Sequence, residues 1–196
     1  MIGPRGRLRQ IETAFQGPII CRGYRRTWAF PQEVAALIEG ATADGSVLHL
    51  FGGRVTFGLR IDADRATAPH VVGNAFFPPF RCESFDSVVC DPPYDRASNG
   101  LWAQVLVPAA CLARHRVWWF STYSLDTGFH GLKLLRWWAV MPSSQGELRY
   151  LAELERTRHP YGGCWPRARD GQRSLAPAIR KFDWRSRIDH PNLPGM

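Results

Sequence analysis

The stretch from Phe85 to Tyr94, with the sequence FDSVVCDPPY, constrains the fold of this chain more than any other. Its β-branched pair, Val88 and Val89, is typical of a buried strand. Two consecutive prolines cannot continue a sheet, because neither has an amide hydrogen and each restricts the residue before it. The strand is therefore predicted to end at Asp91, which places that carboxylate at the carboxyl end of a strand. In open α/β sheets, ligands bind at that edge.

Three further strands are predicted upstream, and they end in residues suited to contact a ligand. The strand at 46–51 runs into Gly52–Gly53, a pair that lets the backbone approach a ligand without a Cβ in the way. A glycine turn in a hairpin is the alternative for this pair. The strand at 57–61 ends at Asp62, where Rossmann sheets place an acid that accepts hydrogen bonds from ribose hydroxyls. A short third strand is expected at 71–76.

The glycine loop, the acid and the Asp-Pro-Pro-Tyr tetrapeptide, in this order, resemble the class I S-adenosylmethionine-dependent methyltransferases that modify adenine N6 or cytosine N4 in DNA. The resemblance covers about residues 27–155. It implies a Rossmann-like α/β sheet, mostly parallel with a C-terminal antiparallel hairpin, S-adenosylmethionine as cofactor, and no metal. His49 stands where the family usually has an acid, and Val55 where a further glycine is usual. By position, the resemblance assigns cofactor binding to His49, Phe51, Gly52, Gly53, Asp62, Asn74 and Ala75.

The same resemblance assigns catalysis to the tetrapeptide Asp91, Pro92, Pro93 and Tyr94. An exocyclic amino group is a poor nucleophile, because its lone pair is delocalised into the ring. The Asp91 carboxylate and the Pro92 carbonyl can each accept one of its hydrogens. Tyr94 offers a stacking surface to a base that has left the helix. The alternative for these residues is a rigid turn.

The remaining pattern predicts helices and a closing hairpin. A helix is expected from Pro31 to Gly40, and Asp64 is expected to cap a later one. Trp137 and Trp138 are adjacent in a predicted strand, so they should face opposite sides, with both in the core. Further predictions are a helix at 101–113 that Pro108 kinks or splits, and strands at 116–121, 133–140 and 148–154, the last two joined by a turn.

Charge is divided unevenly along the 196 residues, whose net charge is +8. Residues 1–40 hold six Arg against three Glu, residues 41–148 hold nine basic against nine acidic residues, and residues 149–196 hold ten against five. We therefore expect one domain: a basic arm at 1–26, a catalytic core at 27–157 and a basic tail at 158–196. Basic flanks suggest a polyanion partner; ordinary solvated surface is the alternative. The family resemblance favours DNA over RNA as that polyanion.

The five cysteines include no C-x-x-C pair, which argues against a zinc site or a disulfide framework and predicts free thiols. No apolar run is long enough to span a membrane, and residues 1–5 lack the apolar stretch of a signal peptide. The expected location is the cytoplasm, without membrane association.

The resemblance implies a DNA amino-methyltransferase, with adenine N6 as the first target. An RNA base methyltransferase would use the same motif. A protein glutamine methyltransferase is a further alternative, although that family normally has Asn in place of Asp91. A nucleic-acid-binding protein that kept the fold and lost catalysis is the alternative from another class. The target base, the recognition sequence, the choice between DNA and RNA and the oligomeric state are open at this stage.

Overall fold

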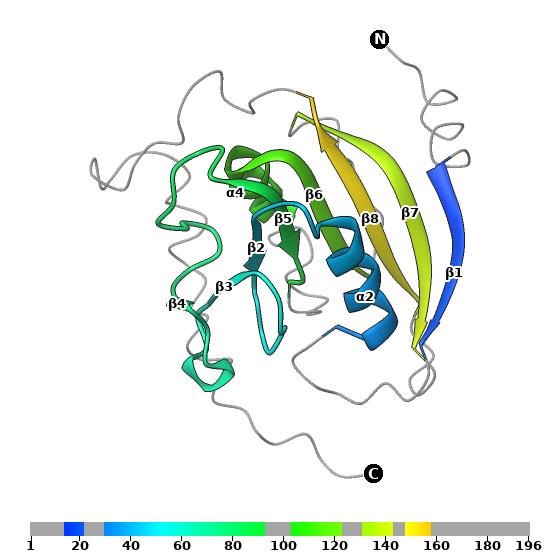
Figure 1. Ribbon diagram of the computed structural model, residues 1–196, viewed down its shortest axis with the longest axis horizontal. Coiled ribbons are helices and arrows are strands. Elements are labelled where there is room, and N and C mark those ends of the chain that lie inside the picture. The colour runs from blue at the N-terminus through cyan, green and yellow to red at the C-terminus, as the bar shows by residue number, and fades with distance from the viewer. Residues whose placement is uncertain (1–13, 22–29, 93–102, 123–130, 143–147, 158–196) are drawn as a thin grey trace. The chain divides into compact units, whose positions relative to one another are not determined.

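The structure is a computed structural model that describes residues 14–21, 30–92, 103–122, 131–142 and 148–157. Within these residues eight strands form one sheet in the order β1-β7-β8-β6-β5-β2-β3-β4 (Figure 1). The strands are β1 Phe15–Cys21, β2 Val47–Leu50, β3 Leu59–Asp62, β4 Val71–Val72, β5 Phe85–Cys90, β6 Ala113–Ser121, β7 Leu132–Pro142 and β8 Arg149–Arg156. The helices are α2 Gln32–Ala41, α4 Leu106–Leu112 and the short 3-10 turns η1 Arg65–Thr67 and η3 Ala103–Val105.

Strand direction confirms the predicted sheet. Strand β8 is antiparallel to both of its neighbours, β6 and β7. The other neighbouring pairs are all parallel. This is an α/β sheet, mostly parallel, with an antiparallel C-terminal hairpin. The carboxyl ends of β5, β2, β3 and β4 consequently lie next to one another along one edge.

The core has two layers, one on each face of the sheet, because successive side chains of a strand point to opposite faces. Leu48 and Trp119 belong to the layer that α4 covers. Trp118 belongs to the other layer, together with Val34 and Ile38 of α2. The two helices thus lie on opposite faces (Figure 1).

Trp137 and Trp138 divide between these layers as predicted. The Trp138 ring stacks on Trp118 with centroids 5.9 Å apart. Trp137 contacts Phe15 of β1 at 4.4 Å and Tyr150 of β8 at 5.4 Å. Core packing therefore accounts for both tryptophans.

The predicted helices form with small changes in their bounds. Helix α2 begins after Pro31 and continues one residue past Gly40. Asp64 accepts a hydrogen bond from the backbone N–H of Ala66 at 2.8 Å and so caps η1, as expected. The 101–113 segment is split into η3 and α4, with Pro108 as the third residue of α4, where a missing amide hydrogen costs no intrahelical bond. The strand expected at 71–76 has only two residues, Val71–Val72.

Strand β1 was not predicted and lies within the expected N-terminal arm. It pairs in parallel with β7 at the edge of the sheet. Its Gly17 and Pro18 hide the usual alternation, and proline is tolerated in a strand mainly at sheet edges.

The prediction of free thiols is wrong for Cys82 and Cys111, which form a disulfide with Cα atoms 5.0 Å apart. The two residues are 29 positions apart, and they meet because the loop before β5 packs on α4. Cys21 and Cys90 are free and buried. None of the helices in the described ranges has the length and apolarity that a bilayer crossing requires.

Candidate active site

The structure brings Asp91, Gly52 and Asp62 to one edge of the sheet, where neighbouring strand ends are joined by backbone hydrogen bonds. Asp91 donates its N–H to the carbonyl of Leu50 over 3.4 Å, which links the ends of β5 and β2. Gly52 donates to Ile61 over 3.0 Å, which links β2 to β3. Gly73 donates to the Asp62 carbonyl over 2.9 Å and links β3 to β4.

The Asp62 carboxylate is half-buried at the end of β3, and each of its oxygens accepts a backbone N–H. One oxygen accepts from Gly53 and the other from Asp64, both at 2.9 Å. A carboxylate oxygen has two lone pairs, so each retains capacity for another donor. Asp62 therefore joins two loops and can still accept hydrogen bonds from a ligand.

The glycine pair is more fully used by the protein than the sequence suggests. Gly52 donates to Ile61 and accepts from Val55, whereas Gly53 donates to Asp62 and accepts from Arg60. A Cβ on Gly52 would lie 2.6 Å from the Cβ of Arg60, so this glycine makes room for a side chain of the protein itself. Gly53 has a φ of 46°, a left-handed conformation that favours glycine.

Arg60 is the site residue that sequence reasoning missed. Its guanidinium donates to the carbonyls of Gly53 at 2.9 Å, Thr67 at 3.3 Å and Ala68 at 2.9 Å. The signal available in the sequence was its spacing: Arg60 precedes Asp62 by two residues in a strand, so the two side chains leave the same face.

His49 lies inside the protein, with 1% of its surface exposed. It packs edge-on against Phe57 with ring centroids 4.7 Å apart and lies 6.2 Å from Phe30. Burial, together with the nearby positive charge of Arg60, lowers the pKa of His49 to about 3. At neutral pH it is an uncharged core residue.

Phe51, Asn74 and Ala75 occupy the loops that follow β2 and β4. Phe51 has a φ of 61°, which is uncommon for an aromatic residue and is typical of constrained backbone near ligand sites. Its ring lies edge-on to Phe76 with centroids 6.3 Å apart. The exposed Asn74 accepts the Phe76 N–H at 2.9 Å, and Ala75 is buried.

Asp91 is half-buried and Pro92 is buried, directly after β5. Burial and then the Asp91 carboxylate raise the pKa of the preceding Cys90 thiol. Pro93 and Tyr94 lie outside the described residues, so their assigned roles stay predictions.

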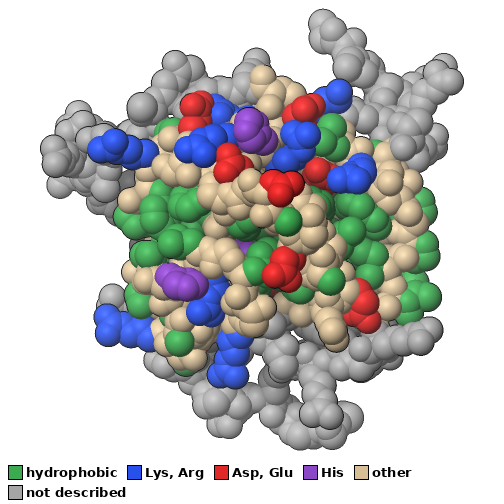
Figure 2. Space-filling view, in the orientation of Figure 1, with side chains coloured by type: hydrophobic (Ala, Val, Ile, Leu, Met, Phe, Trp, Pro, Cys, Tyr) green, Lys and Arg blue, Asp and Glu red, His purple; other side chains and the backbone are tan. Residues whose placement is uncertain are grey.

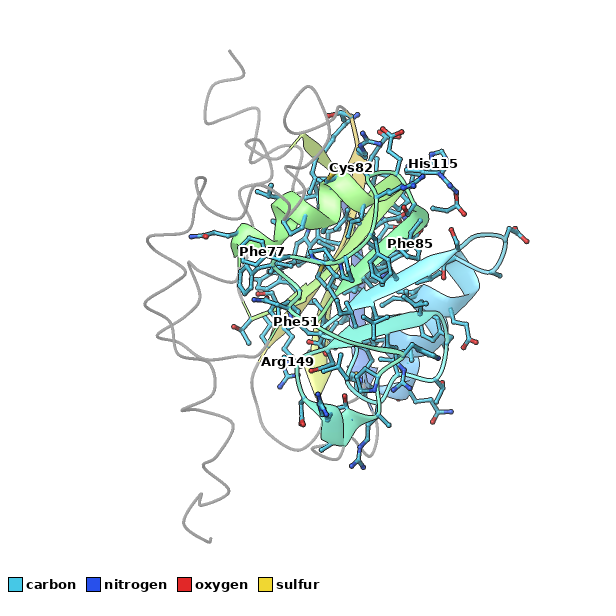
Figure 3. The ribbon with its side chains drawn as sticks, turned by 90° about the vertical axis from the view of Figure 1, so that its left-hand side faces the viewer. Phe51, Phe77, Cys82, Phe85, His115 and Arg149 are labelled. Atoms are coloured by element: carbon cyan, nitrogen blue, oxygen red, sulfur yellow. A yellow bond between two sulfur atoms is a disulfide. The ribbon has the colours of Figure 1, made fainter. Side chains whose placement is uncertain are left out.

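The amino-terminal ends of β5 and β6 lie at the opposite edge of the sheet, away from the candidate site. Charged side chains of both signs lie along the upper rim of Figure 2, at this edge. Figure 3 places Phe51 and Arg149 toward one end of the sheet and His115 toward the other. Asp86 at this opposite edge accepts from Ser46 and Arg114, and hydrogen bonds from Ser46 are the main reason why its pKa falls to about 2.

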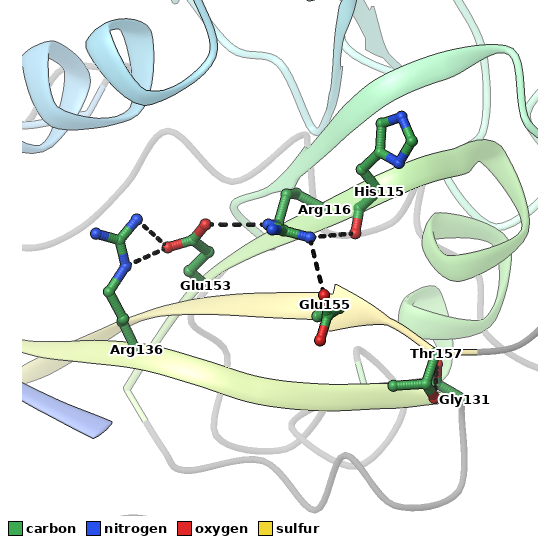
Figure 4. A network of polar contacts seen from close by, with 7 residues as sticks. All are labelled: His115, Arg116, Gly131, Arg136, Glu153, Glu155 and Thr157. Carbon is green, nitrogen blue, oxygen red and sulfur yellow. Dashed lines mark hydrogen bonds and ion pairs between the residues drawn. The ribbon is translucent and has the colours of Figure 1, made fainter. Parts of the chain in front are cut away.

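A further ionic network joins the three long strands β6, β7 and β8 (Figure 4). Glu153 is 5% exposed and pairs with both Arg116 and Arg136. Arg116 also pairs with Glu155 at 3.5 Å. Because a buried carboxylate requires such pairing, this network is explained by the fold, and we assign it no chemistry.

Comparison with known proteins supports the fold. No protein-family model and no curated protein sequence matches the chain. Among solved structures, TrmN from Thermus thermophilus is similar with a TM-score of 0.51 and 16% identity, over 67% of this chain. The chain resembles the class I methyltransferase fold. The match spans 50% of the length of TrmN.

A second solved structure, PH1948 of Pyrococcus horikoshii, is provisionally described as an RNA methyltransferase. Its TM-score is 0.47 at 11% identity, over 81% of this chain and 100% of that one.

Of the residues at this edge, Asp62 fits the implied cofactor, S-adenosylmethionine, and the two glycine amides do not. The Asp62 carboxylate fits, because it can accept further hydrogen bonds from ribose hydroxyls. The amide hydrogens of Gly52 and Gly53 do not, because both are already donated within the protein. The cofactor contact at this edge is therefore expected at the acid rather than at the glycine amides.

Proposed function

We propose that this protein is an S-adenosylmethionine-dependent methyltransferase that acts on an exocyclic amino group of a nucleic-acid base, with adenine N6 of DNA as the first target. The observation that carries the proposal is the position of Asp91 and Pro92. They follow β5 directly, and the Asp91 N–H donates a hydrogen bond to the carbonyl of Leu50 at the end of β2. Strand β3, which ends at Asp62, is the next neighbour of β2 in the sheet. Acceptor groups for a substrate amine and for a ribose thus share one edge.

This chain's residues would act by holding the amine. The Asp91 carboxylate and the Pro92 carbonyl accept its two hydrogens, which increases the electron density available on the nitrogen. When bound, S-adenosylmethionine supplies an electrophilic methyl group on a sulfonium. The half-burial of Asp91 strengthens this contact, because a hydrogen bond to a charged acceptor gains strength away from water.

The choice of DNA over RNA rests on the resemblance of the Asp-Pro-Pro-Tyr motif, and the choice of nucleic acid also on the basic flanks of the sequence. An RNA base remains the alternative acceptor, since the same acceptors suit any exocyclic amine.

The deciding experiment incubates the protein with methyl-labelled S-adenosylmethionine and separate DNA, RNA and protein acceptors, then identifies the modified nucleoside. Label in N6-methyladenine of DNA is the expected result. Asp91→Ala should lower turnover by orders of magnitude and leave cofactor binding almost intact, because the carboxylate acts on the amine. Label in RNA alone would move the target to RNA, and an active Asp91→Ala variant would refute the role of this edge.

Tyr94 provides a second check on the same proposal. Tyr94→Phe keeps the stacking face and should retain much of the activity. Tyr94→Ala should lose about 1 to 3 kcal/mol of base stacking and weaken substrate capture. Equal losses in the two variants would contradict a stacking role.

A second candidate is a nucleic-acid-binding protein that has kept the fold without catalysis. The observation that favours it is the glycine pair, whose amide hydrogens are engaged within the protein. A thermal shift with S-adenosylmethionine separates the two candidates, because a ligand that binds the native state raises its stability. A shift that shrinks in Asp62→Ala supports the enzyme; no shift at millimolar ligand supports the binding protein.

A further inference from the structure

The connection between β2 and β3 is unusually short for its topology. The two strands are parallel neighbours, yet only residues 51–58 lie between them. A parallel connection ordinarily takes a dozen or more residues and usually contains a helix. Here the chain must return to the start of the next strand without one, so other contacts have to hold the loop.

Two side chains of β3 supply those contacts. Asp62 accepts the N–H of Gly53, and Arg60 donates to the carbonyl of the same residue, both at 2.9 Å. The N–H and the carbonyl of Gly53 are thus held by a carboxylate and a guanidinium from one face of the strand. The close approach of Arg60 requires a glycine at position 52, where a Cβ would lie 2.6 Å from the Cβ of Arg60.

Arg60 also reaches the next loop. The same guanidinium donates to the carbonyls of Thr67 and Ala68, at the end of η1. Ala68 has a φ of 49°, a left-handed conformation that is uncommon for alanine and needs support from its surroundings. One side chain therefore joins the loop after β2 to the loop after β3, with Asp62 between them.

We propose that Arg60 is a positioning residue for cofactor binding: it holds these two loops together and thereby keeps the Asp62 carboxylate in place to accept the ribose hydroxyls. This inference rests on the proposed methyltransferase function. Lysine cannot replace it, because an ammonium lacks the planar fork that reaches three carbonyls in two loops.

The first test measures backbone hydrogen exchange without any ligand. Arg60→Ala and Arg60→Lys should both speed exchange in residues 51–58 and 63–70 together, at least tenfold, because one side chain holds both loops. The matched control is Arg65→Ala, since Arg65 is exposed in the same η1 turn. Exchange that changes in neither loop, or in one loop only, overturns the proposal.

The second test measures affinity for S-adenosylhomocysteine and the kinetics of methyl transfer. Arg60→Ala should weaken the affinity at least tenfold and raise the cofactor KM, with kcat at saturating cofactor within about twofold of the wild type. Asp91→Ala should show the reverse, with kcat lost and affinity kept. Gly52→Ala should also weaken the affinity, because its added Cβ would collide with Arg60 and displace it.

The outcomes separate this proposal from the proposed function. If the wild type binds no cofactor, the methyltransferase proposal fails and the role of Arg60 fails with it. If the wild type binds and both Arg60 variants bind equally well, only the role of Arg60 is refuted. Tighter binding in Arg60→Ala would also refute it, because the arginine would then be holding the site closed.

Discussion

The two sides of β5 are built in different ways. Strands β6, β7 and β8 have nine, eleven and eight residues, and the tryptophans of β6 and β7 pack in both layers of the core. Strands β2, β3 and β4 have four, four and two residues, and Arg60 and Asp62 hold the loops at their ends. Burial of large apolar side chains is strong and non-directional, whereas hydrogen bonds are weaker and directional. Both sides bury apolar strand residues, but the largest buried side chains lie on the long-strand side, whereas the hydrogen bonds of Arg60 and Asp62 set the loop geometry on the short-strand side.

The largest expected effect would break the long-strand side. Trp119 is fully buried, so Trp119→Ala should lower the free energy of unfolding by about 3 to 5 kcal/mol through lost burial and the cavity left behind. Urea denaturation monitored by circular dichroism measures it. Trp137→Ala, at a partly buried position on the same strand system, is the control and should cost less. Equal costs would mean that burial in the core does not separate these tryptophans.

The disulfide offers a way to sharpen the comparison, because it ties the loop after β4 to α4. Cys82→Ser or reduction should lower the free energy of unfolding by about 3 to 4 kcal/mol, since the bond closes a loop with a sequence separation of 29. Thermal unfolding with and without reductant measures this. Cys90→Ala keeps the disulfide, so its thermal unfolding should respond to reductant as the wild type does. If reductant did not change the thermal unfolding of the wild type, the disulfide would contribute nothing to the stability of either side.

His49 tests the interior of the short-strand side. Its pKa is about 3 in the folded protein and about 6.5 in the unfolded chain. Between these values the unfolded chain binds the proton and the folded protein does not, so stability is full above pH 6.5 and falls as the pH drops. The expected loss is roughly 1 kcal/mol for each pH unit between about pH 6.5 and pH 3.

Urea denaturation at pH 7 and pH 5 measures the His49 contribution. His49→Leu should abolish most of the difference between the two pH values, whereas His115→Leu, at an exposed position, should leave it unchanged. The same slope in His49→Leu would assign the acid sensitivity to other groups.

The smallest expected effect on stability belongs to the polar contacts at the loop ends. Asp62→Asn keeps one acceptor oxygen and turns the other into an amide donor that faces a backbone N–H, so it should cost about 1 to 2 kcal/mol of stability at this half-buried position. Cofactor affinity should fall further, because a charged acceptor for the ribose hydroxyls is replaced by one neutral oxygen. Differential scanning calorimetry beside ligand titration compares the two. A loss of stability as large as that of Trp119→Ala would contradict the division between the two sides.

Much of the fold could be predicted from local sequence. Apolar periodicity predicts the strand that ends at Asp62, the strand that ends just before Asp91, helix α2 and the β7–β8 hairpin. Glycine and proline breakers, which act between near neighbours, mark their ends. The carboxyl ends of parallel strands share an edge, so the candidate site could also be placed in outline before the structure.

Other features depend on which distant segments lie side by side, and only the tertiary structure decided them. Strand β1 forms because β7 offers an edge, despite a weak pattern of its own. Cys82 and Cys111 pair because a loop packs on a helix. The sequence suggested that Gly52 lets the backbone approach a ligand, whereas in the structure it makes room for Arg60. His49 was predicted to bind the cofactor, and in the structure it is a buried neutral side chain beside Phe57. A residue's type determines what it can contact, whereas the contact it makes depends on partners that the chain brings near only when it folds.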